Sequence, residues 1–104
     1  MKYNKLVRDK IPGIIKEKGG TYKIHIADDS EYGDKLKEKL GEEVKEFLES
    51  ENRDEIADML EVIYAILEHK NISKEEIERI RTEKAEKRSS FKEKIILDES
   101  EDSK

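Results

Sequence analysis

The sequence has no cysteine, no tryptophan and a single proline, and aromatic residues make up only 6% of it. Without cysteine there are no disulfides, no thiolate nucleophile and no thiolate metal site. Hydrophobic residues reach 34% of the 104 positions and charged residues 47%. One copy therefore has little apolar material to bury against the entropy of ordering its backbone. Because oligomerisation is the usual remedy, we expect a homodimer or homotetramer.

A dominant charge of one sign is also missing, since the net charge is -5. No strong basic field is present to displace counterions from a phosphate backbone, which argues against a nucleic-acid partner. The basic start of the chain lacks the apolar run and small-residue cleavage site of a secretory signal, and no stretch approaches the roughly 20 apolar residues of a membrane span. We expect a cytoplasmic protein without a membrane partner.

The spacing of apolar residues predicts a mainly all-α fold, a helical bundle of three principal helices with a short N-terminal helix. Pro12 suits the first turn of the short helix. Asn52 or Ser50 can cap the second principal helix, and Ser73 with Glu76 has the capping-box spacing that begins the third. The second principal helix is apolar over more than half of its circumference, so we expect it to be the most buried. The expected helices cover residues 12–18, 31–50, 53–70 and 74–88.

Two short segments could add a small two-stranded ribbon. Residues 22–26 alternate apolar and polar side chains, as a strand with one covered face does, and residues 95–97 form an apolar run that could pair with them. We expect residues 1–97 to be a single domain, because one core rarely divides at this length. The acidic, serine-bearing residues 98–104 are typical of a disordered tail.

Two pairs of acids interrupt the apolar faces of the first two principal helices. Glu43 lies inside the apolar stripe of its helix, and Glu46 lies on the shoulder of that stripe, three residues further on. On the next helix Glu55 interrupts the apolar arc and Asp58 lies at its rim. Antiparallel packing of consecutive helices would bring both pairs to the same end of the helical hairpin. Four carboxylates would then share one small volume.

Such a cluster needs protons or a cation. Two negative charges about 4 Å apart repel by roughly 4 kcal/mol at an effective dielectric near 20, and burial adds a desolvation cost. Carboxylate oxygens are hard ligands, and the lack of cysteine and of a nearby histidine disfavours zinc. Acid pairs at this spacing also arise by chance in so acidic a chain, but two pairs that face each other favour a metal. The expected cofactor is Mg²⁺, which Mn²⁺ could replace.

These motifs resemble those of the MazG-like all-α nucleoside-triphosphate pyrophosphohydrolases. The family pattern ExxE followed by ExxD reads EVKE at 43–46 and EIAD at 55–58. The stretches YNKLVRDKIP at 3–12 and EKAEKR at 83–88 resemble the phosphoribosyl-ATP pyrophosphohydrolase-like branch, so the likeness covers most of the chain. The connection between the two acidic motifs is shorter than in many relatives, and Ser89 and Ser90 stand where relatives often have glycine.

The resemblance implies a Mg²⁺-dependent hydrolase that cleaves the α–β phosphoanhydride of a nucleotide to the monophosphate and pyrophosphate. The expected metal ligands are Glu43, Glu46, Glu55 and Asp58. Glu46 is the candidate catalytic base, because its position on the shoulder is more open than that of Glu43. The candidate ligands of the substrate phosphates are Lys84, Arg88, Arg8 and Lys10.

Two other functions remain open from the sequence. The chain could be a non-catalytic helical dimer, an adaptor or regulator in which the acids are charged packing edges, and the broad apolar arc of residues 53–70 is compatible with this. It could also be a nucleotide sensor that binds without cleaving. For Lys84 and Arg88 the alternative is that their aliphatic stems cover the core while their charged ends reach water.

Overall fold

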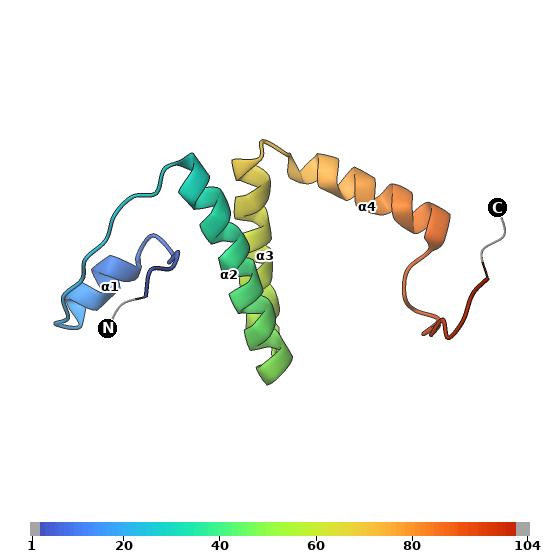
Figure 1. The fold of residues 1–104 in the computed structure, drawn as a ribbon, viewed down its shortest axis with the longest axis horizontal. Helices are drawn as coiled ribbons and strands as arrows, with labels where there is room; N and C mark the ends of the chain where they lie inside the picture. Colours follow the sequence, from blue (N-terminus) through green and yellow to red (C-terminus); the bar gives the residue numbers. More distant parts are fainter. Residues whose placement is uncertain (1–2, 102–104) are drawn as a thin grey trace. The chain divides into compact units, whose positions relative to one another are not determined.

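The structure is a computed structural model that describes residues 3–101, and it is all-α (Figure 1). The chain divides into two compact units, Met1–Ile72 and Ser73–Lys104. The prediction of three principal helices and a short N-terminal helix is confirmed, with boundaries within two residues of those expected. The helices are α1 Ile11–Glu17, α2 Asp29–Ser50, α3 Arg53–His69 and α4 Lys74–Arg88.

Local signals in the sequence explain where the helices of the first unit begin and end. Pro12 lies in the first turn of α1, where its missing N–H has no intrahelical partner to lose. Asp28 caps α2 by accepting a hydrogen bond from the Glu31 amide at 2.9 Å, which starts the helix two residues earlier than expected. Asn52 caps α3 in the same way, accepting from the Glu55 amide at 3.2 Å.

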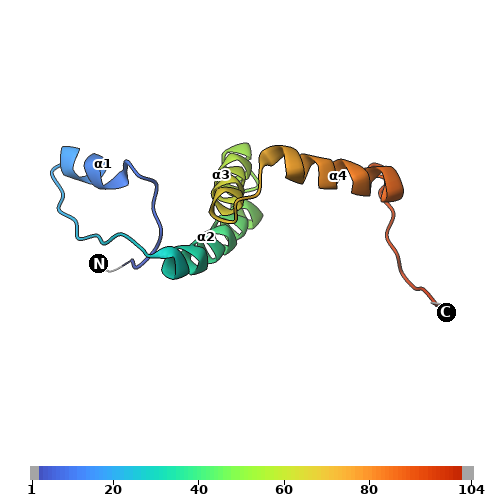
Figure 2. The same ribbon diagram turned by 90° about the horizontal axis from the view of Figure 1, so that it is seen from above.

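Helices α2 and α3 pack against each other as an antiparallel hairpin, and they lie side by side in both views (Figures 1 and 2). Glu51 makes the tight connection possible by adopting a left-handed backbone conformation with φ 56°. The buried apolar side chains of the described residues are Leu36 on α2 and Val62 and Leu67 on α3. The core is therefore a narrow seam between two helices.

The far end of the hairpin is closed by an edge-to-face contact between Tyr32 and His69, whose ring centroids are 5.1 Å apart. Gly33 lies beside this contact, and a Cβ atom there would be 3.1 Å from the His69 ring. The absence of a side chain at Gly33 thus lets the start of α2 approach the end of α3 closely. This contact holds the two helices together at the end away from the Glu51–Asn52 connection.

The second unit contains α4 and the residues that follow it. Ser73 caps α4 by accepting from the Glu76 amide at 3.0 Å, as the capping-box spacing predicts. Arg79 pairs with Glu83 at 3.1 Å, and Arg81 pairs with Glu78. The helix has no buried residue, and Phe91 beyond it is 96% exposed.

Three expectations about the fold, the ribbon, the single domain and the disordered tail, remain to be compared with the structure. No strand is present among residues 3–101, so the ribbon between residues 22–26 and 95–97 is not formed. Neither segment has a second strand within its own unit to complete a hydrogen-bonded ladder. The single domain over 1–97 stays a prediction. So does the disordered tail, whose last residues, 102–104, lie outside those described.

None of the helices in the described part of the chain is long and apolar enough to cross a bilayer. The cytoplasmic location expected from the sequence stays a prediction.

Candidate metal centre

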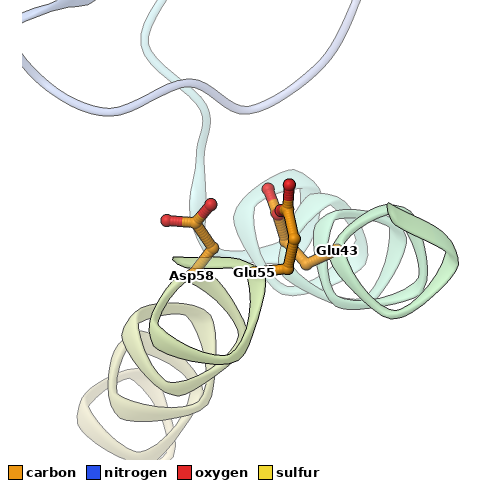
Figure 3. Close-up of side chains that lie close together, drawn as sticks. All are labelled: Glu43, Glu55 and Asp58. Carbon is orange, nitrogen blue, oxygen red and sulfur yellow. The ribbon is translucent and has the colours of Figure 1, made fainter. Parts of the chain in front are cut away.

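Three of the four predicted metal ligands meet on one side of the α2–α3 hairpin. Oxygen atoms of Glu43, Glu55 and Asp58 all lie within 4.8 Å of one another. Figure 3 shows the three carboxylates projecting to the same side, Glu43 from α2 and the other two from α3. The Asn52 cap fixes the first turn of α3, and with it the position of Glu55. The hairpin predicted from the sequence therefore brings the two acidic motifs together.

Glu43 is the buried member of this group, with 6% of its surface exposed. Its Oε2 atom is buried and has no hydrogen-bond partner among the described residues. A buried acceptor left without a partner costs roughly 1–3 kcal/mol, and more when the group is charged. The folded chain thus keeps an unsatisfied carboxylate oxygen in its interior, next to two further carboxylates.

The surroundings of Glu43 disfavour its charge. Burial is the main cause that raises the pKa of its carboxyl group, and the neighbouring Glu46 carboxylate raises it further. Lys39, one turn earlier on α2, opposes this effect from 3.4 Å. Because the net shift is upward, Lys39 does not fully compensate the burial of the charge. A divalent cation would remove the imbalance.

Basic side chains from the segment before α1 also reach the acidic side of the hairpin. Arg8 Nη2 lies 2.9 Å from Asp58 Oδ1, and Lys5 Nζ lies 3.1 Å from Glu42 Oε1. Burial raises the pKa of Glu42, but the hydrogen bond from Lys5 and the charge of Lys39 outweigh it and leave the pKa lowered. Glu42 is therefore well compensated, in contrast to Glu43 beside it.

The other predicted site residues are more scattered. Glu46 is exposed and close enough to Glu43 to raise its pKa, but it is not one of the three acids that share the 4.8 Å cluster. Lys10 is exposed immediately before α1. Lys84 and Arg88 are exposed on α4, in the second unit. Phosphate binding by these three basic residues stays a prediction.

The donor set fits Mg²⁺ or Mn²⁺. Its three acids offer hard oxygen ligands, and Mg²⁺ commonly takes one or two carboxylates together with waters and ligand phosphates. The three clustered acids and the neighbouring Glu46 carry four formal negative charges, and the two cations that contact the cluster, Lys39 and Arg8, offset two of them. One divalent cation would neutralise the remaining two, and it would give the unpartnered Glu43 oxygen a partner.

The sequence named Arg8 as a candidate phosphate ligand, but it did not predict the pairing of Arg8 with Asp58, and Lys39 and Lys5 were missed. Lys39 could have been found, because it stands four residues before Glu43 and side chains at that spacing are neighbours on a helix. The contact between Arg8 and Asp58 joins residues 50 positions apart, and no local pattern indicates it. The same holds for Lys5 and Glu42, 37 positions apart.

In comparisons with family models, curated proteins and solved structures, no match to this chain was found. The resemblance to the MazG-like family therefore rests on the sequence motifs.

Proposed function

We propose that this chain is a Mg²⁺-dependent nucleotide pyrophosphohydrolase that cleaves an α–β phosphoanhydride, releasing a nucleoside monophosphate and pyrophosphate. The observation that carries the proposal is the cluster of Glu43, Glu55 and Asp58 oxygens within 4.8 Å, with the buried Glu43 Oε2 lacking a hydrogen-bond partner. The resemblance of the ExxE and ExxD motifs to the MazG-like family supplies the reaction class.

In this function Glu43, Glu55 and Asp58 hold the metal, and Glu46 completes the ligand set or acts as the base. Mg²⁺ held there would neutralise phosphate charge and lower the pKa of the attacking water. Glu46 is suited to accept the proton of the attacking water, because it is exposed beside the cluster. It would then stand at the edge of the metal site, where water and substrate can reach it.

The basic residues provide the contacts to the substrate phosphates. Arg8 lies at the acidic cluster, and its side chain is exposed enough to reach a phosphate bound there. A guanidinium can grip a phosphate with two parallel hydrogen bonds. Lys10, Lys84 and Arg88 are the further candidates, and all three are exposed.

The test is a panel of nucleoside triphosphates and related nucleotides, with the products identified by chromatography. We expect Mg²⁺-dependent release of pyrophosphate from at least one member. Glu43→Gln and Asp58→Asn should abolish the release while the far-ultraviolet circular dichroism stays helical. Glu49→Gln on the exposed face of α2 is the matched control and should retain activity. If Mg²⁺ and a nucleotide bind but no nucleotide is cleaved, the result favours the nucleotide-sensor alternative.

The apolar residues that the hairpin leaves exposed support assembly with a second copy. They are Val44 and Leu48 on α2 and Ile56, Leu60 and Ile63 on α3. At about 100° per residue, they lie on the side of the hairpin opposite the acids. Two hairpins that pack through these sides would bury the apolar surface and leave each acidic cluster open.

This homo-oligomer is tested with the Leu48→Asp variant, whose position is 69% exposed in one copy. We expect sedimentation velocity to show a dimer or tetramer for the unmodified chain and a smaller species for the variant. A monomer at every concentration of the unmodified chain would rule the assembly out. A stable oligomer without metal binding or nucleotide cleavage would favour the adaptor or regulator.

A further inference from the structure

Arg8 forms an ion pair with one of the carboxylates proposed to bind metal. Its Nη2 atom lies 2.9 Å from Asp58 Oδ1, and the Asp58 carboxylate belongs to the cluster with Glu43 and Glu55. The Arg8 side chain is 59% exposed, and this ion pair is the contact that holds it to the hairpin. The residue comes from the segment before α1, in which the described residues 3–10 form no helix.

We infer that Arg8 is a displaceable cation. It pairs with Asp58 in the metal-free protein, and when Mg²⁺ binds it leaves Asp58 and contacts a phosphate group of the ligand instead. The inference rests on the proposed function. A guanidinium and Mg²⁺ held by the same carboxylate repel each other. Because Arg8 lies outside a helix and is exposed, it can give up this contact without disturbing the α2–α3 core.

Displacement would leave the guanidinium close to the metal with its N–H donors free. Arginine has five such donors in a planar fork that matches phosphate oxygens, and it stays charged at any relevant pH. Arg8 would therefore oppose binding of Mg²⁺ alone and favour binding of Mg²⁺ together with a phosphate ligand. Such a residue couples the two ligands, so that each binds more tightly in the presence of the other.

The first test is calorimetric titration of Mg²⁺ into the full chain without nucleotide. Arg8→Gln should tighten Mg²⁺ binding by about two- to fivefold, the range expected for removing one exposed ion pair. Arg8→Lys keeps a positive charge at the site and should stay near the unmodified chain. Lys5→Gln is the matched control, because it removes a charge and an ion pair from the same segment but contacts Glu42, outside the cluster. It should leave Mg²⁺ affinity nearly unchanged.

The second test uses inorganic phosphate as the probe, with Mg²⁺ at saturation for each variant. Arg8→Gln should weaken phosphate binding severalfold, whereas Lys5→Gln should not. The opposite signs of the two Arg8→Gln effects, tighter metal and weaker phosphate, are what a displaceable cation predicts. A residue that merely positions Asp58 would weaken both when it is replaced.

Equal or weaker Mg²⁺ binding by Arg8→Gln would overturn this inference while leaving the metal site intact. So would unchanged phosphate binding. Absence of Mg²⁺ binding in both the unmodified chain and Arg8→Gln would overturn the proposed function and this inference together. Binding by Arg8→Gln alone would support the inference and show that Arg8 blocks the site.

Discussion

Replacing Glu43 by glutamine removes a buried charge while keeping the size and shape of the side chain. At separations near 4.8 Å and an effective dielectric of about 20, Glu55 and Asp58 each repel a charged Glu43 by roughly 3 kcal/mol. Lys39 at 3.4 Å offsets about 5 kcal/mol of this. The net repulsion is therefore small, and burial, the main cause of the raised pKa of Glu43, adds to the cost of the charge. We expect Glu43→Gln to stabilise the metal-free protein by about 1 kcal/mol, or roughly 4 °C in Tm.

The stabilisation expected from Glu43→Gln depends on pH, and it should decrease as the pH falls. The pKa of Glu43 in the folded protein lies above the ordinary value. The charged carboxylate therefore destabilises the folded protein by its full amount at pH values above that raised pKa. As the pH falls through the raised pKa, the folded protein takes up the proton and the cost declines. Below the ordinary carboxyl pKa of about 4.3 both the folded and the unfolded chain are protonated. The advantage of Glu43→Gln should therefore be full at neutral pH and vanish near pH 4.

The assay is thermal unfolding in chelator, followed by circular dichroism between pH 4 and pH 8, with Glu49→Gln as the control for loss of an acid from the same helix. The control should change Tm by less than about 2 °C, since surface substitutions usually change stability by no more than about 0.5 kcal/mol. Added Mg²⁺ should then raise the Tm of the unmodified chain but not that of Glu43→Gln, because a ligand stabilises the state that binds it. A Glu43→Gln protein that is less stable than the unmodified chain at pH 7 would refute the reasoning.

Three further predictions follow from the fold and the site. Leu36→Ala, at the residue that is 2% exposed, should lower the free energy of unfolding by about 2–5 kcal/mol in urea titrations, and a cost below 1 kcal/mol would contradict the assigned core. Asn52→Ala removes the α3 cap and should lower the free energy of unfolding by about 1 kcal/mol. It should also weaken Mg²⁺ binding in calorimetry, because the first turn of α3 carries Glu55. Unchanged Mg²⁺ affinity would show that the cap does not position the site. Lys84→Gln should raise KM for the nucleotide and leave Mg²⁺ affinity unchanged, whereas an unaltered KM would remove Lys84 from the phosphate site.

Local chemistry accounts for how well the helices could be predicted. Pro12, Asn52 and Ser73 each act on the first turn of a helix, and such signals need no knowledge of the rest of the chain. The acidic cluster followed from the same logic. Once a tight break joins two helices, antiparallel packing is expected, and residues close to the break on both helices become neighbours. Glu43 and Glu55 are placed in this way.

Features that depend on distant partners could not be predicted. The pairing of Arg8 with Asp58 depends on where the N-terminal segment lies against the hairpin. The periodicity of the sequence does not indicate that position. The prediction of a ribbon was wrong for a similar reason. An alternating pattern at residues 22–26 indicates a strand only if another strand lies beside it. The apolar arc of α3 is wider than the face that α2 can cover, so Leu60 and Ile63 remain partly exposed.

The location of the metal is the central claim, and Mn²⁺ tests it directly because its unpaired electrons broaden the signals of nearby nuclei. We would add trace Mn²⁺ to ¹⁵N-labelled protein and follow the backbone amide signals. The amides of Glu43, Glu55 and Asp58 should broaden first, and excess Mg²⁺ should restore them. Two other acidic stretches, residues 28–31 and 98–101, are internal controls and should be unaffected at the same Mn²⁺ concentration. Equal broadening at those stretches, or no recovery with Mg²⁺, would contradict a metal site between α2 and α3.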